Sequence, residues 1–100
     1  MSSSETAKPK QVILELTVNN HPGVMSHVCG LFSRRAFNVD GILCMPLTNG
    51  NTSRIWLRMQ AGARLPQVES QLLKLHDVRS VRRHPPQHAV FGSLQAFFQE

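Results

Sequence analysis

The chain has 100 residues, of which 41% are hydrophobic, and this length suits one small domain of marginal stability by itself. Eleven Lys and Arg against six Asp and Glu give a formal net charge of +5, but the basic residues are scattered and select no partner on their own. The two cysteines lack CxxC spacing, no early apolar run resembles a signal peptide, and no stretch approaches the ~20 apolar residues of a membrane span. We therefore expect a soluble, cytoplasmic protein with free thiols.

The chain begins with a polar segment, after which apolar and other residues alternate as they do in a strand. Residues 1–10 (MSSSETAKPK) lack apolar periodicity and are expected to form a disordered lead-in. Every second residue is then apolar, which predicts a strand with one buried face: Val12, Leu14, Leu16 and Val18. A folded domain is predicted over residues 11–84.

A turn-rich segment, residues 19–23 (NNHPG), ends this strand, and a helix is predicted from there to about Ala36. Its apolar residues recur at i, i+4, i+7 and i+8: Val24, Val28, Leu31 and Phe32. Proline near the first turn fits a helix start, because the N–H of that position is unpaired anyway. Cys29 lies beside the apolar stripe, and we expect it to be a small buried thiol.

Two further strands are predicted around an Asn-Gly turn. Residues 38–47 (NVDGILCMPL) indicate a strand that Pro46 would end or confine to a sheet edge. The segment 48–51 (TNGN) is typical of a hairpin. Residues 53–60 then place Ile55, Leu57 and Met59 on one face and Arg54, Trp56, Arg58 and Gln60 on the other. This alternation predicts an antiparallel third strand.

The remaining elements complete a known compact unit. Leu65, Val68, Leu72 and Leu75 follow one side of a second helix with Pro66 in its first turn, and residues 78–83 give a weak strand signal. We predict a ferredoxin-like βαββαβ α+β domain, with a four-stranded antiparallel sheet and two helices on one face, leaving the other face open. Residues 85–100 form a short apolar tail, whose helix would be marginal unless it docks on something.

The titratable residues show no pattern typical of catalysis or metal binding. The six acids are isolated along the chain, and the five histidines and two cysteines form no tight ligand motif. Ser26 and His27 are neighbours on a helix and point in different directions. We therefore predict no catalytic residue, no metal and no cofactor in this chain.

The connection from the first strand into the first helix is the most informative segment. Its residues, Asn20, His21, Pro22, Gly23, Val24 and Met25, are arranged like an anion-binding corner: unpaired N–H groups, the positive end of a helix dipole, and a glycine that lets a ligand approach. An ordinary turn, in which Asn caps and Gly bends the chain, explains the same residues. Asn38, where the second strand opens, has the same two interpretations.

Taken together, these segments resemble the regulatory ACT domain, and specifically the small subunits of acetolactate (acetohydroxyacid) synthase. The resemblance is closest to the short small subunits of isozyme I. It rests on VILELTVNNHPGVMSHVCGLFSRRAFNVDGILCMPL, SRIWLRM and QLLKLHDVRSV, in that order and spacing. Longer members of the family carry a second C-terminal domain that has no counterpart in these 100 residues.

The resemblance implies a non-catalytic regulatory subunit of branched-chain amino acid biosynthesis. Such subunits are implied to be homodimers that bind valine, a feedback inhibitor, between two ACT domains. They also activate a large catalytic subunit, which is implied to use thiamine diphosphate, Mg and FAD. Asn20 and Gly23 match the family's Asn and Gly before the first helix, and Asn38 matches the Asn that opens the second strand.

The resemblance also implies how valine would be held. Its carboxylate would meet backbone N–H groups near Gly23 and Val24, and Asn38 of the facing subunit would complete the polar contacts. The isopropyl group would face Met25, Val39 or Ile42, and the ammonium would meet Asn20 and carbonyls near Val39. His21 and Pro22 complete the binding loop.

Alternatives remain open at this point. An amino-acid-sensing ACT module of another enzyme would carry the same loop. RNA-recognition modules share the sheet and the positive charge, but the third strand offers one outward aromatic, Trp56, where such modules have several. We expect neither nucleic acid nor membrane as a partner. The tail residues Phe91, Leu94, Phe97 and Phe98 either contact the catalytic subunit or pack on their own sheet.

Overall fold

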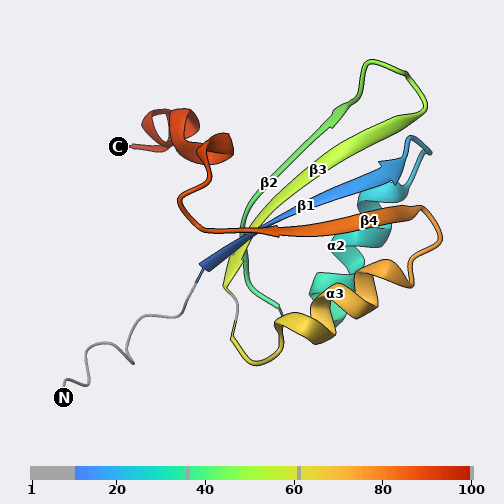
Figure 1. Cartoon of the computed structure of the whole chain (residues 1–100), viewed down its shortest axis with the longest axis horizontal. Helices are drawn as coiled ribbons and strands as arrows, with labels where there is room; N and C mark the ends of the chain where they lie inside the picture. Colours follow the sequence, from blue (N-terminus) through green and yellow to red (C-terminus); the bar gives the residue numbers. More distant parts are fainter. Residues whose placement is uncertain (1–10, 36, 61, 100) are drawn as a thin grey trace.

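The structure is a computed structural model that describes residues 11–35, 37–60 and 62–99. Along the chain it contains β1 (Gln11–Asn19), α2 (Val24–Arg35), β2 (Val39–Pro46), β3 (Thr52–Gln60), α3 (Leu65–Leu73), β4 (Val78–His84) and the 3₁₀ helix η1 (Ala89–Phe98) (Figure 1). The predicted βαββαβ order and the α+β class are confirmed. The expected lead-in at residues 1–10 and the helix end at Ala36 lie outside the described residues.

The four strands form one antiparallel sheet in the order β2-β3-β1-β4. β2 lies at an edge and ends at Pro46, as the proline predicts, because this residue has no N–H for a further ladder bond. The β2–β3 hairpin is closed by the Leu47 N–H, which donates to the Thr52 carbonyl at 2.9 Å. The predicted hairpin at the Asn-Gly turn is therefore confirmed.

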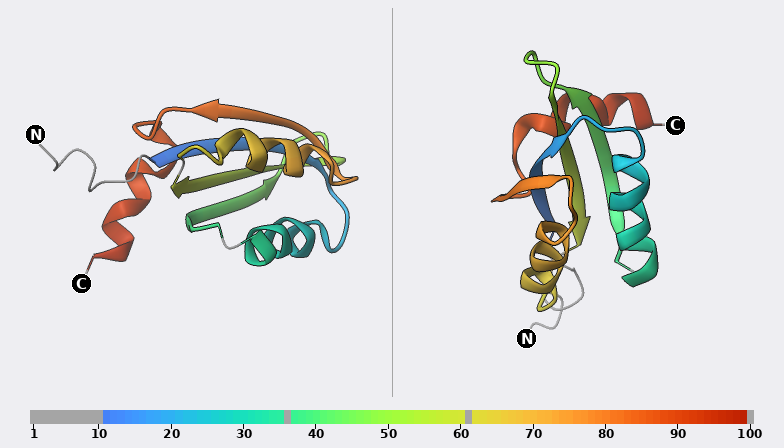
Figure 2. Two further views of the ribbon diagram at one scale, coloured as in Figure 1. Left: turned by 90° about the horizontal axis from the view of Figure 1, so that it is seen from below. Right: turned by 90° about the vertical axis from the view of Figure 1, so that its right-hand side faces the viewer.

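The hydrophobic core lies between the sheet and the two helices. Leu16, Ile55 and Leu57 are completely buried there because alternate residues of β1 and β3 point to the same side. The helices add the apolar stripes predicted from their spacing: Val24, Val28, Leu31 and Phe32 from α2, and Leu65, Val68 and Leu72 from α3. Figure 2 shows α2 near β2 and α3 nearer β1 and β4.

The second helix is shorter than its apolar spacing predicts. α3 ends at Leu73, whereas the pattern extends to Leu75. The N–H groups of Lys74 and Leu75 donate to carbonyls only three residues back, at 3.2 and 3.0 Å, so the chain tightens into a turn. Leu75 still packs against the core from this turn, which explains why its spacing looks helical.

Two expectations about burial are wrong. Cys29 is exposed, because its position on α2 faces away from the buried stripe that contains Val28 and Phe32. The sheet face without α2 and α3, called the helix-free face below, is not fully open. Phe91 of η1 is buried on it, and Ile13 of β1 is completely buried. The predicted placement of both long helices on one face holds, but the tail covers part of the other.

Candidate functional site

The loop between β1 and α2 has the backbone geometry that its glycine suggests. Gly23 has φ +87°, a conformation that residues with a Cβ rarely adopt. A Cβ built on Gly23 would meet no atom within 4 Å, so the space beside this backbone is open. A ligand can therefore approach the peptide groups at the start of α2 closely.

Several N–H groups at the start of α2 are available to an anion. The Val24 N–H donates to the His21 carbonyl at 3.3 Å, and the His27 N–H donates to the Gly23 carbonyl at 3.1 Å. Within the described part of the chain, nothing accepts from the N–H groups of Gly23, Met25 or Ser26. The first turn of α2 also contains no acidic side chain. The helix start is thus a positive corner that no carboxylate of this element neutralises.

The loop is fixed to two neighbouring connections. The Asn20 N–H donates to the Asn51 carbonyl at 3.0 Å, and the Asn20 side chain reaches the Gly50 carbonyl at 3.5 Å. His21 Nδ1 lies 3.0 Å from a carboxylate oxygen of Asp77, which precedes β4. These contacts hold the loop in one position and direct the His21 ring toward Asp77.

Asn38 and the loop lie at opposite ends of the sheet. The Asn38 carbonyl accepts from the N–H of Gln60, the last residue of β3, whereas Asn20 bonds to Asn51, just before β3 begins. Nine residues at about 3.3 Å each separate these points, roughly 30 Å. Within one protomer the structure therefore does not bring Asn38 to the loop.

The apolar candidates occupy different environments. The Val24 side chain is buried in the core, so only its backbone faces the loop. Met25 and Val39 are partly buried against the core, and Ile42 is 38% exposed on the helix side of β2. Pro22 is exposed in the loop. The candidate residues thus form two separate groups, one at the loop and one along β2.

β2 is an accessible edge strand. It pairs with β3 only, among the described strands, and both Cys44 and Met45 are exposed along it. Partial burial raises the pKa of the Cys44 thiol, which makes this thiol less reactive at neutral pH than a fully solvated one. An edge with exposed apolar side chains is a surface onto which another strand can add.

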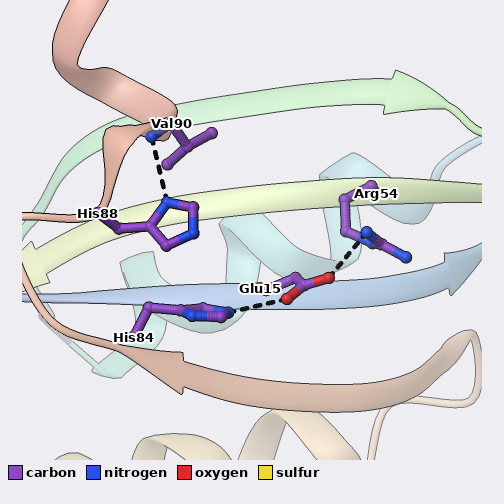
Figure 3. Close-up of polar contacts among 5 residues, drawn as sticks. All are labelled: Glu15, Arg54, His84, His88 and Val90. Carbon is purple, nitrogen blue, oxygen red and sulfur yellow. Dashed lines mark hydrogen bonds and ion pairs between the residues drawn. The ribbon is translucent and has the colours of Figure 1, made fainter.

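The helix-free face carries a charged cluster that the sequence analysis did not predict. Glu15 is only 8% exposed, and its carboxylate lies 2.7 Å from Arg54 Nη1 and 2.8 Å from His84 Nε2 (Figure 3). Glu15 looks isolated along the chain, but its neighbours come from β3 and β4. Strand register is the signal that could have found it, because residue 15 of β1 lies beside Trp56 of β3 and Arg82 of β4.

The remaining chemistry of the chain is sparse. In the ranges 11–35, 37–60 and 62–99, no three His, Cys, Asp or Glu side chains lie together as a metal site would require. No helix among these residues is long and apolar enough to cross a bilayer. Two hollows, of about 240 and 510 Å³, lie on the helix-free face between η1 and β2, and residues 20–25 line neither of them.

Comparison with known proteins gives a consistent result. Residues 14–80 match the family model described as an AHAS small subunit-like ACT domain. The chain is 56% identical over 88 residues to the acetolactate synthase isozyme 1 small subunit of Escherichia coli K12, covering 88% of this chain and 92% of that protein. It is 40% identical over 70 residues to the acetolactate synthase small subunit of Haemophilus influenzae, covering 69% of this chain and 43% of that protein.

A solved structure also matches. The crystal structure of the acetolactate synthase small subunit from Thermotoga maritima superposes with a TM-score of 0.71 at 30% identity. The match covers 78% of this chain and 49% of that one. The chain thus corresponds to about half of the Thermotoga and Haemophilus proteins and to nearly all of the Escherichia coli protein.

Proposed function

The chain belongs to the ACT-domain small subunits of acetolactate synthase, and we propose that it binds valine at the interface of a homodimer and so regulates a large catalytic subunit that it also activates. The observation that carries this proposal is the open corner at Gly23, where a positive φ and free N–H groups meet the start of α2. This corner fits the carboxylate of an amino acid.

The carboxylate would be held mainly by main-chain donors. The N–H groups of Gly23, Met25 and Ser26 are available, while that of Val24 already donates to His21. Backbone donors at a helix start cost little reorganisation, because α2 and the contacts of Asn20 and His21 fix them before a ligand arrives. The Asn20 amide oxygen and carbonyls near Val39 would accept from the ammonium group.

A second copy of the chain is needed to complete the site. Asn38 lies roughly 30 Å from the loop of its own protomer. A second copy turned by 180° and paired with the first along β2 would reverse this arrangement and bring its Asn38 toward the first copy's loop. Because β2 is an edge strand with Ile42 and Cys44 exposed, it suits such antiparallel pairing.

This arrangement would couple ligand occupancy to the packing of two chains. The isopropyl group of valine would contact Met25 of one chain and Val39 or Ile42 of the other, so both chains contribute apolar surface. A ligand held by two protomers favours the dimer geometry that it bridges, and the large subunit would sense that geometry. Feedback inhibition by valine follows from this coupling.

A titration tests the ligand class. Calorimetry of the isolated chain with valine, leucine, isoleucine and lysine should give binding for the branched-chain amino acids and none for lysine, whose ammonium has no place in an apolar pocket. Each titration should be repeated with the large subunit present. If none of the four binds under either condition, the proposal is wrong.

A pair of glycine variants tests the location. Gly23→Asp should weaken valine binding at least roughly 100-fold, because a carboxylate would occupy the place of the ligand's own. Gly23→Asn has nearly the same shape and the same backbone strain without the charge, so it serves as the matched control and should lose much less. Activation of the large subunit should survive in both variants. Equal losses in the two variants would argue against a carboxylate at this corner.

Mixing with the large subunit distinguishes the alternative of an ACT module for another enzyme. Acetolactate formation by the large subunit should rise when this chain is added and fall again when valine is added. If acetolactate formation does not respond to the chain, the domain regulates a different enzyme, whatever ligand it binds.

A further inference from the structure

The side chains of the helix-free face form three rows across the sheet, and none of them belongs to the proposed valine site. Residues directly opposite one another on neighbouring strands share a face, so the register gives its rows. From β2 through β3 and β1 to β4 these are Gly41, Arg58, Ile13 and His84; Leu43, Trp56, Glu15 and Arg82; and Met45, Arg54, Thr17 and Ser80. The face combines apolar, aromatic and cationic side chains.

The tail is docked on this face. The ring centroids of Trp56, His84 and His88 lie 4.6 to 5.4 Å apart, and His88 Nδ1 accepts from the Val90 N–H at 3.1 Å (Figure 3). The Phe91 ring lies over Gly41, where a Cβ would come within 3.0 Å of it. These contacts fix where η1 begins, so its outer surface has a defined position.

The outer surface of η1 is unusually apolar. Phe97 and Phe98 are 80% and 79% exposed, and Met45 on the adjacent strand is 71% exposed. Phe98 lines the hollow of about 240 Å³. Met45 lines the hollow of about 510 Å³, together with Leu43, Pro46, Trp56, Val90 and Leu94. Large apolar side chains gathered around a hollow are typical of a surface that another protein covers.

The same face carries more positive than negative charge. Arg54 is paired with Glu15, but Arg58 and Arg82 make no ion pair with any described carboxylate. The guanidinium carbon of Arg58 lies 5.3 Å from the centroid of the Phe91 ring, whereas Arg82 is exposed. Asp40, at the rim, accepts from Gln11. Acidic groups on a partner would therefore find unused cationic donors here.

We propose that η1 and the helix-free face together are the surface that docks the large catalytic subunit, through an apolar segment flanked by acidic side chains. This proposal rests on the proposed function, which supplies such a partner. A second copy of the chain is a poor occupant, because it would bring the same excess of cationic side chains to the contact. The proposed dimer pairs through the edge of β2, beside this face rather than on it.

A matched pair of variants tests the docking surface. In the double variant Phe97→Glu with Phe98→Glu, the concentration of small subunit that half-saturates activation of the large subunit should rise at least ~30-fold, since exposed aromatic anchors dominate interfaces. Leu73→Glu is the control, because Leu73 is also exposed, at 52%, but lies on α3. Its half-saturating concentration should change less than ~3-fold.

A second pair tests the charge. Arg82→Glu should raise the half-saturating concentration about 10-fold, while Arg79→Glu, in the β-bulge near the start of the same strand and outside the three rows named above, should have little effect. The double Phe variant should still bind valine and sediment like the unchanged protein.

The outcomes separate the two proposals. If the unchanged chain activates the large subunit and the double Phe variant does so at the same concentration, the docking surface is refuted while the proposed function stands. If the double variant instead dissociates the isolated homodimer, this face is a contact between copies and the docking proposal is wrong. If the unchanged chain neither binds nor activates the large subunit, both proposals fail.

Discussion

The two faces of the sheet solve the problem of burial in different ways. The helix-covered face buries mainly apolar side chains, such as Leu14, Leu16 and Ile55, all with no exposed surface. The helix-free face buries a carboxylate, Glu15, and compensates it with Arg54 and His84 at hydrogen-bond distance. The first arrangement provides stability through area removed from water, whereas the second keeps polar and aromatic groups near a surface that can contact other molecules.

The largest effect on stability should come from the helix-covered face. Leu16→Ala removes a completely buried side chain and leaves a cavity, so the free energy of unfolding should fall by about 3 kcal/mol. Urea denaturation at a fixed protein concentration measures this, because a dimer links stability to concentration. The control Leu73→Ala, on the exposed side of α3, should cost less than about 0.5 kcal/mol. Equal losses would mean that this core does not dominate.

A smaller loss is expected from the helix-free face. Glu15→Gln keeps the shape of the side chain but removes the charge that Arg54 and His84 contact. The free energy of unfolding should therefore fall by about 2 kcal/mol. The partly exposed partners can turn to water, which keeps the loss below that of Leu16→Ala. A loss above that of Leu16→Ala in the same urea experiment would reverse the comparison between the faces.

The difference between the faces also explains what could be predicted from the sequence. Apolar periodicity predicted β1, β3 and both long helices, because burial on one face imposes a period of two or 3.6. β4 was predicted mainly from the order of the elements, since its own pattern is weak. It could not find the Glu15 cluster, since Glu15, Arg54 and His84 meet only through the register of three strands. Cys29 was misplaced because a thiol beside an apolar stripe is compatible with either side of a helix boundary.

The candidate site divides in the same manner. The Gly23 corner is local, so its turn residues and helix start were visible in six consecutive positions. The early end of α3 was not visible, because Leu75 packs against the core from a turn and keeps the helical spacing. The separation of Asn38 from the loop likewise depends on pairing along β3, which no local pattern reports.

A milder effect is expected at the end of the sheet that would meet a partner's loop. Asn38→Ala should weaken valine binding about 5- to 10-fold, since it removes hydrogen bonds without adding repulsion. Because Asn38 is exposed, the free energy of unfolding should stay within about 0.5 kcal/mol of the unchanged protein. Calorimetry and urea denaturation of the same preparation check both statements. A large loss of stability would show that Asn38 stabilises the turn rather than a ligand.

The smallest effect concerns how the tail lies on the helix-free face. Gly41→Ala places a methyl group 3.0 Å from the Phe91 ring, which must shift to accommodate it. We expect a loss of less than about 1 kcal/mol, confined to η1, because a flexible side chain absorbs the contact. Hydrogen exchange should become faster in residues 89–98 and stay unchanged in β1. Unchanged exchange in the tail would show that Phe91 does not hold it.

Mixed dimers test directly whether one valine is held by the loop of one chain and Asn38 of another. Gly23→Asp and Asn38→Ala chains should each bind valine weakly alone. In a mixed dimer one site combines both defects and the other has neither, so random mixing should restore unaltered affinity to about a quarter of all sites. Calorimetric titration of the mixture with valine should therefore reveal a new tight fraction. If no tight sites appear on mixing, the shared site is contradicted.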